Sequence, residues 1–353
     1  MQTDPVNSRT VLVIGGINAD VLGRTLGPPA LHTSNPARAG VTPGGVARNV
    51  AEVVARLLPG GAAVRLLGAV GSDPLGSSVL EATHAAGVDV SGVLRLPGQT
   101  GLYLAVLDDA GELHIGLADM GLTGALTPDV TATWLAEVDR AALLILDANL
   151  PPHTVAALLR RAGRAGVRAI VEPVSAPKAA RLAQSLYGDS SDGDWPGSDS
   201  SDSDWHSGSD WHGAFLVTPD RAELEAMTGQ AQVAAAARTL LDGGVQNVLV
   251  TLGRAGSVLF SAGRPPVMTP AFGTTVQDVT GAGDALVAGL SAGLLRGLEL
   301  PEAVRSGHAC AALTVASART VPEGLSWERL ERQAASGLAD AGSTDASPVD
   351  WDQ

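Results

Sequence analysis

The amino-acid sequence predicts an α/β protein with a doubly wound, mostly parallel sheet and helices on both faces. Short apolar runs alternate with segments of helical periodicity along most of the chain. Hydrophobic residues make up 45% of the chain but aromatic residues only 3%, so the core must consist mainly of Ala, Val and Leu. The 43 glycines suit the many short turns of such a fold. Binding sites in these sheets lie at the C-terminal ends of the strands.

The predicted elements follow one another in a regular order. Near the start, an apolar run that ends in glycines predicts a buried strand, and Pro-Gly-Gly opens an amphipathic helix. From residue 142 onward, strands and helices alternate. We expect a single domain over residues 1–330. Its strands are predicted at 11–15, 64–70, 142–146, 168–171, 214–218 and 247–251, and its helices at 46–58, 75–86, 152–165, 176–186, 221–228 and 231–242.

Two segments do not fit this alternation. Residues 19–43 are rich in Gly, Pro, Thr and Ser, and 100–107 and 112–117 flank an Asp-Asp-Ala-Gly turn and predict a hairpin. We predict that these segments form a small β lid, from about 19–43 and 100–117, over the first half of the sheet. Ordinary surface loops are the alternative.

Composition and charge narrow the classes of function. A single cysteine, Cys310, leaves no internal disulfide or Cys-based zinc site and suits a reducing, cytoplasmic compartment. Of the 37 acidic residues, 11 lie in 187–213 and 336–353, which hold no Lys or Arg, and the remaining 26 nearly balance the 23 basic residues. A nucleic-acid surface should be basic, and no apolar stretch reaches the roughly 18 residues of a membrane span. We therefore expect neither a nucleic acid nor a membrane as a partner.

Two acidic segments have compositions that cannot build a core. Residues 188–213 consist mainly of Ser, Asp and Gly, and we predict a disordered insertion there. The segment also holds three Trp, two of them followed by His, so a metal or partner role is the alternative. The tail at 336–353 is predicted to be disordered as well.

A Gly-rich turn before an apolar helix carries the clearest chemical signal. Thr280-Gly281-Ala282-Gly283 forms the turn, and Asp284 falls in the first turn of the helix. The free N–H groups and partial positive charge of a helix N-terminus suit a phosphate. An Asp at that position can take a proton from a hydroxyl aimed at the phosphate. No Lys-Ser/Thr follows the last glycine, so this is not a Walker A loop, and a tight packing turn is the alternative for the glycines alone.

A second group of polar residues lies near the N-terminus. Asn18 and Asp20 follow the first strand and, two residues apart in extended chain, face the same side. A carboxylate and a carboxamide there can chelate the vicinal hydroxyls of a sugar. Further on, Gly44 and Gly45 let a ligand approach the main chain, and Asn49 lies about one helical turn later.

These motifs, in this order, resemble the PfkB-type (ribokinase-like) family of sugar and nucleoside kinases over roughly residues 10–325, the insertion excepted. The resemblance implies a ribokinase-like fold and ATP-dependent phosphorylation of an alcohol. It implies that Asp284 is the catalytic base and that the N–H groups of residues 281–283 form the anion hole. The residues expected to bind the sugar or nucleoside are Asn18, Asp20, Gly44, Gly45 and Asn49.

The same resemblance assigns residues to the nucleotide-binding part of the site. Asp220 and Glu223 match the family's N-x-x-E element, which orders Mg²⁺ and phosphates, with Asp220 in place of the usual Asn. Thr251 and Gly253 match the T-x-G segment that lines the nucleotide site. Family members use the positions of Asp278 and Thr280 for an activating monovalent cation, so K⁺ is expected beside ATP and Mg²⁺. The family commonly dimerises through its lids, and a homodimer here is expected on that resemblance only.

Several segments resemble pseudouridine kinase more than ribokinase. Ribokinase typically has Lys after the Gly-Gly pair, where this chain has Val46. Thr33 and Ser34 lie in the predicted lid, where they could hydrogen-bond a base, although a solvated turn is the alternative. Met120 and Lys178 are assigned to the substrate on this resemblance. The segments are 15–20, 33–38, 44–52, 103–108, 118–120, 146–150 and 172–179.

The expected activity is therefore ATP-dependent phosphorylation of the 5′-hydroxyl of a nucleoside, with pseudouridine as the first choice. A kinase for ribose, adenosine or another sugar is the alternative within the family. A non-catalytic nucleoside-binding protein is the alternative from another class.

Overall fold

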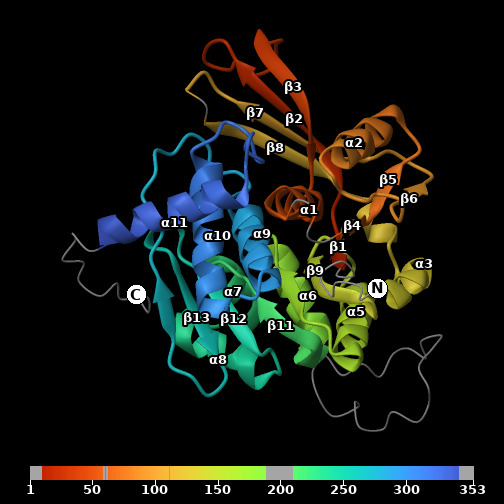
Figure 1. Ribbon diagram of the computed structural model, residues 1–353. Helices are drawn as coiled ribbons and strands as arrows, with labels where there is room; N and C mark the ends of the chain where they lie inside the picture. Colours follow the sequence, from red (N-terminus) through yellow and green to blue (C-terminus); the bar gives the residue numbers. More distant parts are fainter. Residues whose placement is uncertain (1–9, 59, 61–62, 111, 188–209, 342–353) are drawn as a thin grey trace.

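The main sheet has the predicted α/β architecture. The computed structural model describes residues 10–341 apart from 59, 61–62, 111 and 188–209 (Figure 1). The eight strands lie in the order β14-β13-β12-β11-β10-β9-β1-β4. Neighbours from β12 to β4 are parallel, whereas β13 and β14 are added antiparallel at one edge. The strands are β1 (Thr10–Ile14), β4 (Ala63–Leu67), β9 (Ala141–Asp147), β10 (Ala169–Glu172), β11 (Ala214–Val217), β12 (Asn247–Thr251), β13 (Ser257–Ser261) and β14 (Val267–Thr269).

Helices cover both faces of this sheet and give it two hydrophobic cores. Alternate residues of β1 point to opposite sides: Val11 and Val13 join the core with α1, α9 and α10, and Leu12 and Ile14 join the core with α5 to α8. Burial on both faces explains why the central strands are apolar almost throughout. The helices are α1 (Val46–Leu57), α2 (Pro74–Ala85), α3 (Pro128–Thr131), α4 (Leu135–Val138), α5 (Pro152–Ala165), α6 (Ala176–Tyr187), α7 (Arg221–Thr228), α8 (Val233–Asp242), α9 (Ala282–Leu295), α10 (Leu300–Val315) and α11 (Trp327–Ala341).

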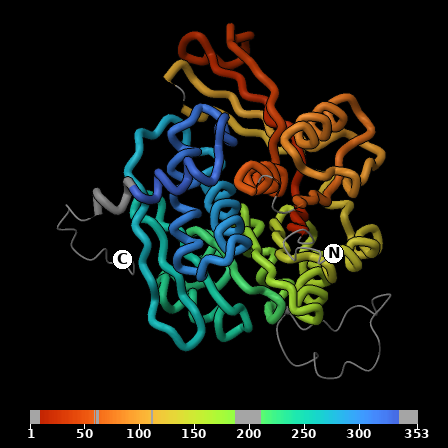
Figure 2. The backbone as a smooth tube through the Cα atoms, in the orientation of Figure 1, coloured from red at the N-terminus to blue at the C-terminus, as the bar shows by residue number. Residues whose placement is uncertain are grey.

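A four-stranded sheet in the order β3-β2-β7-β8 projects from one end of the body (Figures 1 and 2). It joins the segment 19–43 to the predicted hairpin, and we call it the lid. Strand β2 begins four residues after β1 ends, and β3 ends two residues before α1 begins. The lid is therefore attached to the body where the polar N-terminal residues lie. Its strands are β2 (Asn18–Thr25), β3 (Ala37–Gly44), β7 (Gly101–Leu107) and β8 (Leu113–Asp119).

Three expectations need correction. The strand predicted at 64–70 is divided, because β5 (Ala69–Gly71) leaves the main sheet to pair with β6 (Leu94–Leu96). Residues 210–213, assigned to the insertion, form a 3₁₀ turn packed on α5, where Trp211 is fully buried because its large apolar surface completes that core. The first residues of the predicted acidic tail continue α11 to Ala341. The rest of both segments lies outside the described residues.

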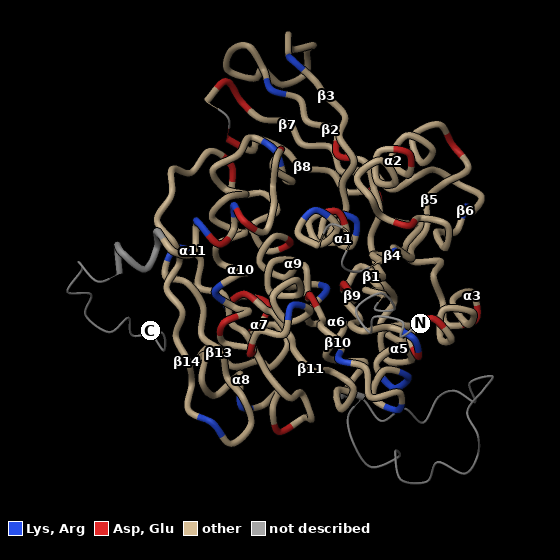
Figure 3. The backbone as a smooth tube through the Cα atoms, viewed as in Figure 1, with Lys and Arg blue, Asp and Glu red and all other residues tan. Residues whose placement is uncertain are grey.

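The described part of the chain contains no helix that is both long and apolar enough to cross a bilayer. Acidic and basic residues are mixed over it rather than separated into faces (Figure 3).

Candidate active site

A cavity of about 290 Å³ opens at the C-terminal edge of the main sheet. Residues at the ends of β10, β11 and β12 line it together with the first turn of α9 and the start of α1. This is where doubly wound sheets bind their ligands. The lining residues are Val46, Glu172, Val174, Thr218, Asp220, Glu223, Thr251, Val279, Gly281, Ala282, Gly283, Asp284 and Leu286.

The helix α9 begins at this cavity with a glycine in the left-handed conformation. Gly281, its N-cap, has φ 77°, and a Cβ there would lie 2.3 Å from Thr320 Cγ2. Any other residue would be strained and would clash. Residues 281–283 all line the cavity, and N–H groups in a first helical turn have no acceptor within the helix. Among the residues that the structure describes, the Ala282 N–H has only a long hydrogen bond, 3.3 Å to Val279 O, so this helix end can receive an anion.

Asp284 lies half-buried in the same helical turn, beside α1. It accepts a hydrogen bond from Asn49, with 2.9 Å between Nδ2 and Oδ2. Burial raises the pKa of Asp284 to about 7; the bond from Asn49 opposes this shift, and the carboxylates of Asp147 and Asp20 add to it. A carboxyl group with a pKa near neutrality can accept a proton at physiological pH, as a general base must.

The polar residues at the start of the lid lie next to two glycines that their packing requires. Asn18 Nδ2 donates to Asp20 Oδ1 over 2.7 Å, and burial raises the pKa of Asp20. A Cβ on Gly44 would lie 2.3 Å from the Asp20 carboxylate, and a Cβ on Gly45 would lie 2.9 Å from the Asn18 side chain. The two predicted motifs are thus one cluster in space.

Two further predicted residues lie beside this cluster. A Cβ on Gly101 would be 3.2 Å from Asn18 Cβ and 3.3 Å from Met120 Sδ, which places Met120 next to Asn18. Lys178 Nζ donates to Asn149 Oδ1 over 2.5 Å, and burial lowers the pKa of Lys178. Asn149, two residues after the end of β9, therefore anchors Lys178 at the edge of the sheet.

A buried carboxylate that sequence reasoning did not single out holds the cluster together. Asp147, the last residue of β9, accepts N–H bonds from Gly16 (2.8 Å), Ala47 (2.9 Å) and Asn149 (2.9 Å). It is 1% exposed, and burial raises its pKa despite these bonds. In the sequence, the signal for such a residue is an acid at the end of an otherwise apolar strand. Burying a charged carboxylate costs free energy unless it has hydrogen-bond partners.

On the opposite side of the cavity, Asp220 and Glu223 cap α7. Asp220 Oδ1 accepts from Glu223 N (2.7 Å), and Glu223 Oε2 accepts from Asp220 N (2.8 Å). This reciprocal capping box shows that an acid at position 220 serves as N-cap as well as an amide would. Burial raises the pKa of Glu223 to about 7, and the charge of Asp220 contributes.

A second carboxylate that the sequence analysis did not select faces Glu223. Glu172 ends β10 and accepts a 2.5 Å hydrogen bond from Thr218 Oγ1. Burial raises its pKa well above the usual value, and the nearby charges of Glu223 and Asp284 act in the same direction. Three carboxyl groups that line the cavity, those of Glu172, Glu223 and Asp284, therefore all have raised pKa values.

The remaining predicted residues are placed less tightly. Thr251 lines the cavity, and Gly253 follows in a 3₁₀ turn with φ 58°. Asp278 Oδ1 accepts from Thr280 N (2.8 Å), so these two share one turn before α9. The loop between β2 and β3 carries Thr33 and Ser34, which are exposed and are not joined to the cluster by any hydrogen bond in the described part of the structure.

Comparison with known proteins identifies this arrangement. The model of the pfkB family carbohydrate kinases matches residues 8–190 and 201–325. The chain belongs to the pfkB family of carbohydrate kinases. It is 31% identical to pseudouridine kinase of Escherichia coli (strain K12) over 311 residues, 86% of this chain and 90% of the other. It is 27% identical to ribokinase of Schizosaccharomyces pombe over 319 residues, 86% and 91% of the two chains.

Among solved structures, a carbohydrate kinase from Agrobacterium tumefaciens superposes with a TM-score of 0.75. It is 29% identical and covers 93% of this chain and 97% of its own. The fold is therefore ribokinase-like, as predicted. The protein is a phosphotransferase with an alcohol group of a sugar or nucleoside as acceptor, and kinases of this family use ATP and Mg²⁺.

The cavity of this pfkB kinase fits a magnesium–nucleotide complex. Phosphates suit the N-terminus of α9, and Mg²⁺ suits the oxygens of Glu172 and Glu223, two neighbouring carboxyl groups whose pKa values are raised chiefly by burial. No group of three or more His, Cys, Asp or Glu in the described residues could hold a metal by itself. A Mg²⁺ ion there would take its other ligands from phosphate and water.

Proposed function

We propose that this kinase transfers the γ-phosphoryl group of ATP to the 5′-hydroxyl of pseudouridine. The chemistry rests on one observation, the half-buried Asp284 with a pKa of about 7, placed in the anion-binding turn of α9 and contacted by Asn49. The choice of acceptor is supported by the similarity to pseudouridine kinase over most of both chains.

In the proposed reaction, Asn18, Asp20 and Asn49 hold the ribose hydroxyls so that the 5′-oxygen faces Asp284. Asp284 accepts the hydroxyl proton while the oxygen attacks the γ-phosphorus. The bond from this phosphorus to the bridging oxygen breaks, and ADP leaves. The N–H groups of residues 281–283 stabilise the charge on the phosphoryl oxygens, the main source of catalysis in such transfers.

The lid supplies the contacts to the base in this proposal. A uracil joined through carbon keeps an additional ring N–H, which a polar lid can recognise through Thr33 and Ser34. Met120, beside Asn18, and Lys178 complete the substrate side. On the other side, Thr251 and Gly253 border the nucleotide, and Asp220 with Glu223 orders its Mg²⁺.

We further propose that Asp278 and Thr280 take part in a K⁺ site. Asp278 lies in the turn before α9, where hydrogen bonds fix both its side chain and its main chain. Its Oδ1 accepts from Thr280 N, and its own N–H donates to Val315 O over 3.3 Å. A cation bound there would fix the anion-binding turn.

The kinase is also proposed to dimerise through the outer face of the lid. Strand pairing puts Val41, Leu104 and Leu117 in one row, with Ile115 on the same face. Val41 is 59%, Leu117 56% and Ile115 47% exposed. An apolar sheet face of this kind marks an interaction site.

The deciding experiment measures ATP consumption by the purified protein with Mg²⁺, with and without K⁺. Pseudouridine, uridine, ribose and adenosine are offered separately, and the product is checked for a 5′-phosphate. Selective turnover of pseudouridine supports the proposal. Turnover of ribose or adenosine alone keeps the reaction and refutes the acceptor. This second outcome has support in the 27% identity to ribokinase, whereas Val46 at the usual position of the ribokinase lysine favours a nucleoside.

A further inference from the structure

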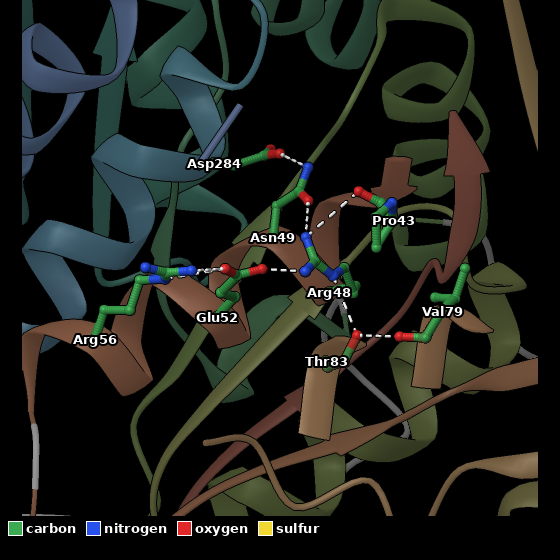
Figure 4. A network of polar contacts seen from close by, with 8 residues as sticks. All are labelled: Pro43, Arg48, Asn49, Glu52, Arg56, Val79, Thr83 and Asp284. Carbon is green, nitrogen blue, oxygen red and sulfur yellow. Dashed lines mark hydrogen bonds and ion pairs between the residues drawn. The ribbon is translucent and has the colours of Figure 1, made fainter. Parts of the chain in front are cut away.

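A buried arginine lies directly behind the side chains of the site. Arg48, on α1, is 5% exposed, and its guanidinium donates hydrogen bonds to groups on three elements of the fold (Figure 4). It thereby joins the end of the lid strand β3, the helix α2 and its own helix. Nε bonds Thr83 Oγ1 (3.2 Å), Nη1 bonds Pro43 O (3.4 Å) and Asn49 Oδ1 (3.1 Å), and Nη2 bonds Glu52.

The contact with Asn49 decides which end of its carboxamide faces Asp284. A guanidinium has only donors, so it holds the carboxamide oxygen toward Arg48. The amino end then points to Asp284, where Nδ2 donates to Oδ2 (Figure 4). If the carboxamide were turned over, its oxygen would face the carboxylate and two acceptors would oppose each other. Arg48 thus holds the orientation that stabilises the ionised form of Asp284.

We propose that Arg48 is a positioning residue for phosphoryl transfer: through the carboxamide of Asn49 it orients Asp284 for proton acceptance, and through Pro43 it connects this orientation to the lid. The inference rests on the proposed role of Asp284 as the base. It assigns a function to a buried charge that has no contact with the cavity.

The ion pairs around Arg48 provide a matched control. A buried charge is costly unless it is paired, and Glu52 pairs with Arg48 through one carboxylate oxygen and with Arg56 through the other. Burial lowers the pKa of the Arg48 guanidinium, and Glu52 opposes that shift. Arg56 is more exposed, and both of its hydrogen bonds in the described part of the structure go to Glu52. Replacing Arg56 therefore disturbs the same carboxylate without touching Asn49.

The test compares steady-state kinetics and pH profiles of full-length variants with the acceptor that the wild type phosphorylates. We expect Arg48→Met to lower kcat about 10- to 100-fold, the range for losing an oriented hydrogen bond to a charged group, and to leave the KM for ATP nearly unchanged. Arg56→Met is expected to keep kcat close to the wild-type value. In an Asn49→Ala background, Arg48→Met is expected to have no further effect on kcat, because the two residues act as one unit.

The pH profile supplies a readout that a purely structural role would not move. Loss of the oriented Asn49 donor removes an interaction that lowers the pKa of Asp284. The acidic limb of kcat/KM should therefore shift to higher pH in Arg48→Met and stay in place in Arg56→Met. The other carboxyl groups near Asp284 are retained in both variants; they are Asp20 on β2, Asp147 on β9 and Glu172 on β10. Arg48→Met also removes a charge that lowers the pKa of Asp20, whereas Arg48→Lys keeps that charge.

Two further variants keep the test decisive if unpaired Glu52 prevents Arg48→Met from folding. Arg48→Met/Glu52→Gln removes both charges, and Arg48→Lys keeps the charge without the forked geometry; both are expected to show the kinetic loss and the shifted limb. The inference would be overturned if Arg48→Met lowered kcat equally with and without Asn49→Ala. It would also be overturned if the acidic limb of the kcat/KM profile did not move. A wild type that phosphorylates no acceptor refutes the proposed function instead, so the two failures are distinguishable.

Discussion

Replacing Asp284 with Asn is the sharpest test of the proposed chemistry. The change keeps the size of the side chain, and its carboxamide oxygen can still accept from Asn49 Nδ2, so the surrounding geometry can persist. Losing a general base costs about 10²–10⁴-fold in rate, or about 3–5 kcal/mol of activation free energy. The acceptor should still bind, because Asn18 and Asp20 are untouched.

The raised pKa of Asp284 gives the wild type a matching signature. With a pKa of about 7, about half of the molecules carry the carboxylate at pH 7 and about 1% at pH 5. The value of kcat/KM should therefore fall about tenfold per pH unit below pH 7 and level off above it. Coupled assays of ADP formation between pH 5 and 9 measure the profile, and calorimetry measures acceptor binding to Asp284→Asn. A variant with near wild-type turnover, or a flat wild-type profile, would refute the role of Asp284 as the base.

The same variant has a predictable effect on stability. Because burial raises the pKa of Asp284 from 3.8 to about 7, the folded state binds this proton more tightly than the unfolded state. The group therefore destabilises the folded protein progressively as the pH rises from about 4 to 7. Asp284→Asn, which has no charge to desolvate, should be more stable than the wild type at pH 8 by up to about 4 kcal/mol. Thermal unfolding at pH 8 and pH 4 checks that the difference vanishes in acid.

Three more perturbations follow from the fold. Gly281→Ala should lower both Tm and kcat, because a Cβ at φ 77° would lie 2.3 Å from Thr320 Cγ2; a variant with wild-type values would contradict the need for glycine. Trp211→Ala should cost about 3–5 kcal/mol in urea unfolding, whereas deleting 188–209, which spares Trp211, should change neither unfolding nor turnover. Ile115→Arg should convert a dimer to a monomer in sedimentation velocity, and a monomeric wild type would refute the lid interface.

The fold class and many of the candidate residues could be predicted from the sequence because they depend on patterns within short segments. The glycines and Asp284 lie within four positions of one another, and the turn and helix that they predict need no distant partner. Asp147 and Glu172 carry only a weak signal, since each is a single acid at the end of an apolar strand. Asp147 receives N–H bonds from residues 131 and 100 positions away, Gly16 and Ala47. Only the packing of β1, α1 and β9 brings these groups together.

Arg48 illustrates the same limit on a helix. Its position next to Asn49 is visible in the sequence, but its bonds to Thr83 and Pro43 depend on how α2 and the lid pack against α1. The strands β13 and β14 and their antiparallel pairing were also not predicted. Trp211 lies near the end of the segment of low complexity, 188–213, and its burial depends on the surface that α5 offers.

The way the lid is attached has a mechanical consequence. Ile14 ends the first body strand four residues before Asn18 begins β2, and Gly44 ends β3 two residues before α1 begins, so two of the connections between lid and body lie beside the groups proposed to hold the sugar. In a rotating arm, displacement grows with distance from the pivot. A swing that moves Thr33 and Ser34 far would move Asn18 and Asp20 little. On the proposed function, a lid that turned about these connections would hold the sugar in register while it released the base.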